Sequence, residues 1–213
     1  MKTSPLLLAA VLAAAAAFFL KTAAYTSSPP PNHKNTYKNF VLTQCNDKNV
    51  LYPHLCEQTL LPYANSIHGN LGKLAHKALN ISLTRVQAMT SCISRQKSHD
   101  TNITAALADC NNTLATAQSY IKQSLQQMDS PAPPKQGGIV GENVKTWASA
   151  ALTNEDTCKD GLSKYSTNTS SAAWAWQNCN SKYLVENVTS NALAFVNKYY
   201  STPPRHPPPP PKY

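Results

Sequence analysis

Apolar residues recur at intervals of three, four or seven positions along four separate stretches of the chain. In chain order these stripes are Leu79, Leu83, Val86 and Ile93; Leu107, Cys110, Leu114, Ala117, Ile121, Leu125 and Met128; Val144, Trp147, Ala151 and Cys158; and Val185, Val188, Ala192, Phe195 and Tyr199. Such spacing gathers apolar side chains on one face of an α-helix. Alternation typical of strands is absent. The pattern therefore predicts four amphipathic helices and an all-α fold.

Proline placement separates these helices. Residues 63–130 and 135–202 contain no proline, whereas SPAPPKQGG between them has the composition of a loop. Four helices joined by short loops predict an antiparallel up-down-up-down four-helix bundle over residues 65–202. Residues 38–64, which contain Pro53 and Pro62, predict a helical hairpin that precedes the bundle.

Capping residues indicate where the helices begin and end. The expected N-terminal caps are Ser66 or Asn70 for the first bundle helix and Asp100 or Thr101 for the second. The pair Gly137-Gly138 ends the loop before the third helix. Gly161 is expected at the C′ position that closes that helix.

The two ends of the chain differ from the predicted bundle. Residues 1–24, with Lys2 before an apolar run and small residues at the end, are typical of a cleaved secretory signal peptide. The alternative is a membrane anchor, but the run is shorter than the roughly 20 residues that span a bilayer. Residues 25–37 are expected to form a flexible proline-containing arm. Residues 203–213 form a proline-rich tail that resembles extensin-type sequences and favours polyproline II structure, with a disordered tail as the alternative.

The net charge is +9, from 19 basic and 10 acidic residues. Without Lys2 and Lys21 of the signal peptide, 17 basic residues remain and the charge is +7. Much of that charge lies in the proline-bearing ends, and no basic motif with interleaved aromatic residues is present. We therefore expect a soluble secreted protein that binds neither nucleic acid nor membrane.

The six cysteines and five N-glycosylation sequons agree with secretion. The cysteines are Cys45, Cys56, Cys92, Cys110, Cys158 and Cys179, and the sequons begin at Asn80, Asn102, Asn111, Asn168 and Asn187. An even cysteine count in a secreted chain favours disulfides, and no CxxC pair suggests zinc. The histidines form no HExxH motif, and the adjacent Glu155 and Asp156 diverge by about 100° on a helix. We therefore expect neither an enzyme nor a bound metal or cofactor.

Five segments, taken in order, carry a family resemblance. They read CNDKNVLYPHLCEQTL, LGKLAHKALNISLTRV, ALADC, TWASAALTNEDTCKDG and VTSNALAFV. Over residues 38–200 the chain closely resembles the plant invertase and pectin methylesterase inhibitor family. The resemblance implies a four-helix bundle with an N-terminal hairpin.

The resemblance also implies disulfides. It pairs Cys45 with Cys56 inside the hairpin, and Cys110 with Cys158 between the second and third bundle helices, where Trp147 would fill the interior. Cys92 and Cys179 are additional to the family's minimal pattern. They are expected at the same end of the bundle, so a third bridge is predicted, with two free buried thiols as the alternative.

The function that the resemblance implies is stoichiometric inhibition, in which helices cover the substrate cleft of an enzyme. The expected contact residues are Asn154, Thr157 and Asp160 on the third helix and Asn112 on the second. Glu155 and Asp156 are expected to face outward beside them. The alternative is a solvated face in which Asp156 pairs with Lys159 or Lys164.

The expected target is pectin methylesterase, because TWASAALT resembles that branch of the family. Acid invertase is the alternative target. The invertase-inhibitor branch is expected to carry Pro-Lys-Phe in the loop before the third helix, whereas this chain reads Pro134-Lys135-Gln136 and lacks the phenylalanine. The second helix departs from the family at Asn111 and Asn112, and a glycan on Asn111 would obstruct docking there. Weak electrostatic contact with pectin is expected from the basic arms. A wall-anchored structural protein and a detached pectinesterase pro-region are the competing hypotheses for the whole chain.

Overall fold

The computed structural model describes residues 33–130, 138–165 and 171–201. The predicted signal peptide, the proline-rich tail, the loop 131–137 and the sequon at Asn168 lie outside these residues. Every element of the described chain is helical, which confirms the all-α prediction. Within the same part of the chain, no helix is long and apolar enough to cross a membrane.

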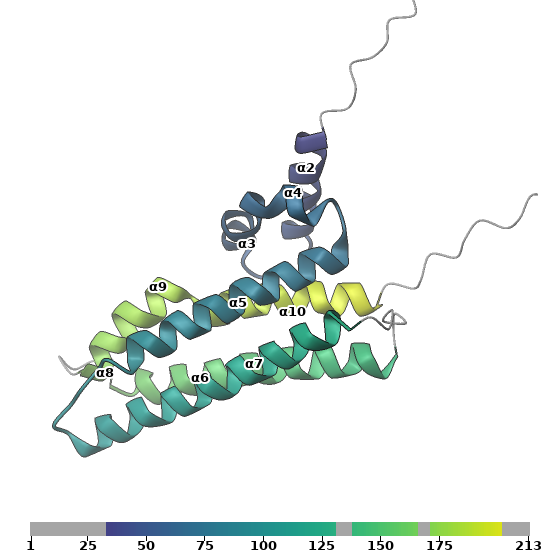
Figure 1. Ribbon diagram of the computed structural model, residues 1–213. Coiled ribbons are helices and arrows are strands. Elements are labelled where there is room, and N and C mark those ends of the chain that lie inside the picture. The colour runs from purple at the N-terminus through teal and green to yellow at the C-terminus, as the bar shows by residue number, and fades with distance from the viewer. Residues whose placement is uncertain (1–32, 131–137, 166–170, 202–213) are drawn as a thin grey trace, which may run out of the picture. The chain divides into compact units, whose positions relative to one another are not determined.

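The helices fall into an N-terminal group and a bundle (Figure 1). The N-terminal group is α2 (His33–Cys45), α3 (Pro53–Leu60), a 3₁₀ turn (Leu61–Tyr63) and α4 (Ala64–Ile67). The bundle is α5 (Leu71–Ile93), α6 (Thr101–Met128), α7 (Ile139–Ser163), α8 (Ser171–Trp174), a π-helical segment (Ala175–Asn180), α9 (Ser181–Tyr183) and α10 (Val185–Ser201). Helix α2 thus begins inside the span 25–37, for which the sequence predicts a flexible arm.

Each long bundle helix packs against two neighbours. Helix α6 contacts α5 and α7, and α10 contacts the same two helices from the other side. Figure 1 shows α5, α6, α7 and α10 running beside one another. The arrangement confirms the predicted four-helix bundle.

Local chemistry fixes the helix starts as predicted. Asn70 Oδ1 accepts a hydrogen bond of 2.9 Å from the Lys73 amide at the start of α5. Asp100 Oδ1 accepts bonds of 2.8 and 3.2 Å from the Asn102 and Ile103 amides at the start of α6. These caps satisfy backbone donors that the first turn of a helix leaves without partners.

The predicted end of α7 is wrong. Gly161 lies inside the last turn, because the helix continues to Ser163 and its C-cap, Lys164, keeps a right-handed conformation. A left-handed C′ glycine is needed only where the backbone turns out of the helix. The chain does not make that turn at Gly161.

The fourth bundle helix is broken, which the pattern did not predict. Leu184 adopts a left-handed conformation (φ 47°, ψ 48°) between α9 and α10, and its amide donates to Asn180 O at 2.8 Å. The preceding π-helical segment carries Cys179, which is joined to Cys92 of α5. This bridge fixes the segmented part of the fourth helix to α5.

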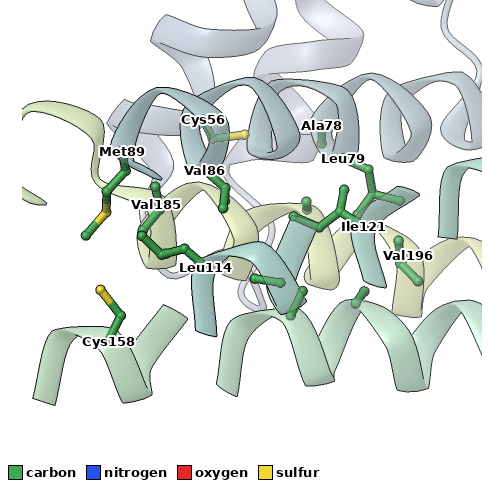
Figure 2. Packing of buried hydrophobic residues seen from close by; sticks show 14 of the residues in the cluster. Cys56, Ala78, Leu79, Val86, Met89, Leu114, Ile121, Cys158, Val185 and Val196 are labelled. Atoms are coloured by element: carbon green, nitrogen blue, oxygen red, sulfur yellow. The ribbon is translucent and has the colours of Figure 1, made fainter. Parts of the chain in front are cut away.

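The core follows the predicted stripes in α5 and α6. In Figure 2, Leu79 and Val86 of α5 and Leu114 and Ile121 of α6 lie between the helices, and all four are fully buried. In α7 three of the four predicted members, Val144, Ala151 and Cys158, are buried. The buried residues of this helix are Gly141, Val144, Ala148, Ala151, Glu155, Cys158 and Leu162.

The expectation for the fourth member, Trp147, is wrong, because this residue is half-buried rather than interior. Ala148 takes the core position instead, and its small side chain lets α7 approach its neighbours closely. Tyr200 replaces Tyr199 at the end of α10 in the same way, because Tyr200 is 2% exposed and Tyr199 is half-buried.

Two contacts fasten the N-terminal group to α10. The side-chain amide of Asn191 accepts from the Tyr52 amide at 3.2 Å and donates to the Tyr52 carbonyl at 2.9 Å. Lys198 Nζ lies 2.6 Å from Asp47 Oδ2, and this hydrogen bond lowers the pKa of Asp47. The region between α2 and α3 is therefore joined to the last helix.

Candidate docking face on helices α6 and α7

Helices α6 and α7 form a covalently joined pair. Cys110 and Cys158 are bridged, with a Cα–Cα distance of 4.2 Å, and both are almost completely buried. The other bridges are Cys45–Cys56 and Cys92–Cys179, the pairing that the sequence predicts. A disulfide restricts the unfolded chain and is worth about 2–4 kcal/mol. The bridge therefore joins α6 and α7 covalently beside this surface.

A groove of about 270 Å³ follows the seam beside this bridge. Helix α6 contributes Asn102, Asp109 and Thr113, and α7 contributes Thr157 and Gly161. The bridge itself forms part of the floor. Lys164 and Tyr165 also line it, so the groove combines small, polar, acidic, basic and aromatic groups.

Gly161 keeps the groove open. A Cβ atom built at Gly161 would have no heavy atom within 4 Å. The glycine is therefore not required by close packing or by its backbone conformation, and its lack of a side chain leaves space at the surface. The sequence pattern assigns Gly161 to a helix end, whereas the empty space beside it depends on the position of α6.

Two predicted contact residues lie on this part of α7. Thr157 is exposed and lines the groove, and its Oγ1 donates to Thr153 O at 2.8 Å. Asn154 is half-buried, and its Nδ2 donates to Ala150 O at 2.8 Å. Both side chains are already held by hydrogen bonds to the helix backbone. They would therefore lose little conformational entropy when a partner contacts them.

Asn154 and the other two predicted contact residues lie outside the groove. Asp160 is exposed on α7 but does not line it, and Asn112 is exposed on α6. Asn112 follows Cys110 by two residues, which turns it by about 200° around the helix axis. Of the four predicted contact residues, the structure therefore places Thr157 alone in the lining of the groove.

Asp156 is engaged with a neighbour. Its Oδ1 lies 2.8 Å from Lys159 Nζ, and this hydrogen bond raises the pKa of Lys159. The alternative interpretation of this stretch as a solvated, paired face therefore holds for Asp156. Thr157 differs, because its hydroxyl bonds to the backbone of its own helix and the residue lines the groove.

The expectation that Glu155 faces outward is wrong. Glu155 is fully buried, and its Oε1 accepts a 2.8 Å hydrogen bond from Thr189 Oγ1 of α10. Thr189 Oγ1 in turn lies 2.6 Å from Ser82 Oγ of α5. Burial raises the pKa of Glu155 well above its usual range, and Glu186 adds to the effect. Glu155 lies on the buried face of α7, so its position around the helix, and not its charge, determines that it is buried.

The described sequons all lie on helices. Asn102 is exposed at the groove, whereas Asn80, Asn111 and Asn187 are half-buried. The hydroxyls of two sequons, Ser82 and Thr189, belong to the buried network. A glycan on Asn102 would lie at the edge of the groove, so this sequon and the candidate docking surface compete for space.

Within residues 33–130, 138–165 and 171–201, no group of three or more histidine, cysteine or acidic side chains is placed to hold a metal ion.

Comparison with known proteins identifies its family. The model of the plant invertase/pectin methylesterase inhibitor family matches residues 39–195, so the chain belongs to this family. A crystal structure of a mutant form of a pectin methylesterase inhibitor from Arabidopsis has the same fold, with a TM-score of 0.57 and 21% identity. That match covers 74% of this chain and 95% of the other.

Three curated relatives show the range of the similarity. Pectinesterase inhibitor 10 of Arabidopsis thaliana is 34% identical over 181 residues, which are 79% of this chain but 55% of that protein. The 21 kDa protein of Daucus carota is 34% identical over 75% of this chain and 83% of its own. Pectinesterase 3 of Phaseolus vulgaris is 27% identical over 69% of this chain and 25% of that protein. The relatives named as inhibitors confirm the expectation that the chain is not an enzyme.

Proposed function

We propose that this protein is secreted to the plant cell wall, where it binds pectin methylesterase one-to-one and covers the enzyme's pectin-binding cleft. Membership of the family and the similarity to named pectinesterase inhibitors support the target. The observation that carries the proposed surface is the rigid α6–α7 groove, lined by Thr157 and opened by Gly161.

The groove suits tight binding because little has to be ordered when it is filled. The Cys110–Cys158 bridge fixes the two helices, and Thr157 is already bonded to Thr153. Pre-organised surfaces bind better because less conformational entropy is lost on association. A side chain that projects from the rim of the enzyme's cleft would enter the space above Gly161. The threonine methyl group and the exposed Asp160 would contact the surrounding surface.

Acid invertase remains the alternative target, because the matching family model covers inhibitors of both enzymes. The test is a side-by-side assay in which the mature protein is mixed with pectin methylesterase and with acid invertase. We expect loss of activity at one equivalent of inhibitor for the methylesterase alone. Inhibition of the invertase alone would transfer the proposal to that enzyme, and inhibition of neither would remove it.

The contact surface has its own test. Thr157→Trp places a large ring over the groove and should weaken inhibition at least about tenfold, which corresponds to about 1.4 kcal/mol. Thr84→Trp is the matched control, because Thr84 is also exposed and donates to the carbonyl four residues earlier, on α5. Unchanged inhibition by Thr157→Trp, with an unchanged melting temperature, would mean that this face meets only water.

A further inference from the structure

A second cavity lies where α4, the start of α5, the end of α6 and the end of α10 meet. Its volume is about 400 Å³, within the range of roughly 300–1,000 Å³ that is usual for small-molecule sites. Its walls include Asn70, Lys73, His76, Lys77, Tyr199 and Tyr200. None of these residues lines the α6–α7 groove, so the two sites are separate.

The basic groups of the cavity favour an anion. Lys73 is exposed in the first turn of α5, and Lys77 lies one turn later, with its Nζ 4.7 Å from the centroid of the Tyr63 ring. His76 Nε2 contacts Asp129 Oδ1 at 3.0 Å, so the one acidic group among the described lining residues is engaged by the imidazole. The N-terminal end of α5 adds positive partial charge at the same place.

Two tyrosines form the inner wall. The rings of Tyr199 and Tyr200 are arranged edge to face, with centroids 4.8 Å apart. Gly72 makes room for Tyr199, because a Cβ atom at Gly72 would lie 2.9 Å from Tyr199 Cε2. The wall therefore combines the face or edge of an aromatic ring with the bare backbone of α5. Such surfaces suit the flat apolar face of a sugar ring.

Tyr200 contributes an unused polar group. The residue is 2% exposed, and its hydroxyl is buried without a hydrogen-bond partner in the described part of the chain. A buried polar group without a partner is uncommon and costs free energy. Burial raises the pKa of Tyr200 to about 12, so the phenol keeps its proton and remains a donor. Because this hydroxyl is closed off, the lysines and the Tyr199 ring are the groups that an occupant of the cavity would contact.

We propose that this cavity binds an acidic saccharide, with its carboxylate against Lys73 and the start of α5 and its ring against Tyr199. An inorganic anion would use the lysines and leave the tyrosine wall empty, whereas a neutral sugar would leave the basic groups without a counter-charge. The ligand class that satisfies both features is a sugar with a carboxylate. The site does not depend on enzyme inhibition, because it shares no residue with the α6–α7 groove.

The test is calorimetric titration of the mature protein with a trimer of galacturonic acid. The fully methyl-esterified trimer and a neutral glucose trimer are the comparison ligands. We expect saturable binding of the acid trimer to one site and affinity at least about tenfold lower for both comparison ligands. Equal binding of the ester, or no saturable binding of the acid, would overturn the proposal.

Three variants locate the binding. Lys73→Ala should lower the affinity for the acid trimer at least about fivefold. Lys122→Ala removes the same charge from an exposed position on α6 outside the cavity and should have no effect. Gly72→Ala should also weaken binding, because it displaces the Tyr199 ring. Equal losses in Lys73→Ala and Lys122→Ala would show a general charge effect and would overturn the site.

The two proposals fail separately. Lys73→Ala should inhibit the enzyme as well as the wild type does, and Thr157→Trp should bind the acid trimer as well as the wild type does. The helical circular dichroism and the melting temperature are measured for every variant. They show whether each variant is folded, so that a loss of affinity is not caused by unfolding.

Discussion

Thr189 Oγ1 donates a 2.8 Å hydrogen bond to Glu155 Oε1 in the centre of the bundle. The other carboxyl oxygen, Oε2, is buried without a partner in the described chain, and burial raises the pKa of Glu155 well above its ordinary value. The folded state therefore holds this proton at pH values where the unfolded chain has released it. Its contribution to stability is full below the unfolded pKa and is lost as pH rises through the folded pKa.

Glu155→Gln should remove this pH dependence. The amide keeps an acceptor for Thr189 and stays neutral at every pH. At a pH of about 4 we expect the variant and the wild type to have similar free energies of unfolding. As the pH rises toward about 7, the variant should become more stable than the wild type. Urea denaturation across this range measures the difference. Glu142→Gln, which changes an exposed carboxylate of the same helix, is the control. A constant gap between wild type and Glu155→Gln would contradict the prediction.

Two glycines of α7 should respond oppositely to alanine. At Gly141 a Cβ atom would lie 2.6 Å from Tyr200 Cδ1 and 3.0 Å from its Cγ, near the base of a buried ring that cannot move away easily. We expect Gly141→Ala to destabilise by about 1–3 kcal/mol, as overpacking does. Gly161→Ala meets open space and should stabilise by up to about 1 kcal/mol through helix propensity. Thermal unfolding of both variants decides, and a stabilised Gly141→Ala would refute the close packing.

The half-buried position of Trp147 predicts a modest stability role. Truncation of a fully buried aromatic residue costs about 3–5 kcal/mol, and Phe195 of α10 is 1% exposed. Phe195→Ala should therefore cost that much, and Trp147→Ala clearly less. Denaturant midpoints of the two variants give the comparison. Equal losses of stability in the two variants would mean that Trp147 is buried in the interior, as the sequence pattern suggests.

The three bridges can be mapped chemically. Non-reducing peptide mapping should recover Cys45–Cys56, Cys92–Cys179 and Cys110–Cys158 as separate linked pairs. The double variant Cys92→Ala/Cys179→Ala should lose about 3–4 kcal/mol, because that bridge closes the longest loop of the three. A peptide that joins Cys45 or Cys56 to a cysteine of the bundle would refute the scheme.

Removal of residues 203–213 should leave folding and inhibition nearly intact, because no periodic apolar stripe extends into them. The basic residues of this segment, Arg205 and Lys212, should instead increase retention on de-esterified pectin at low salt. Melting curves, inhibition assays and a salt-dependent pull-down of the truncated protein check each part. Loss of the thermal transition would show that the tail belongs to the fold.

The sequence predicts best where many residues act together. The stripe of α6 has seven members, so a single misplaced residue does not change the helix phase, and the polar caps Asn70 and Asp100 act locally. The cysteine pairing needed the family resemblance. Short-range rules failed at single positions where packing against neighbouring helices decides, as for Trp147, whose expected place in the core is taken by Ala148.

The remaining differences have tertiary causes. A glutamate is usually exposed, and Glu155 is interior because Thr189 on another helix supplies a donor. Leu184 breaks the fourth bundle helix without a glycine or proline to indicate it. The groove above Gly161 exists only because α6 packs beside α7 and supplies the opposite wall. Of the predicted contact residues, Thr157 lines the groove and the helix phase turns Asn112 away from it, and their contact with an enzyme stays a prediction.

The link between Asn191 and Tyr52 has a consequence for biosynthesis. It joins residues separated by 139 positions, and Lys198–Asp47 joins residues separated by 151. The N-terminal helices are translated early, yet their partners on α10 are translated much later. Contacts so distant along the chain form late, because a long loop has to close before they contribute. The nascent protein therefore completes its fold only when α10 has left the ribosome. A chain that ends before Asn191 cannot form the contacts that join Tyr52 and Asp47 to α10.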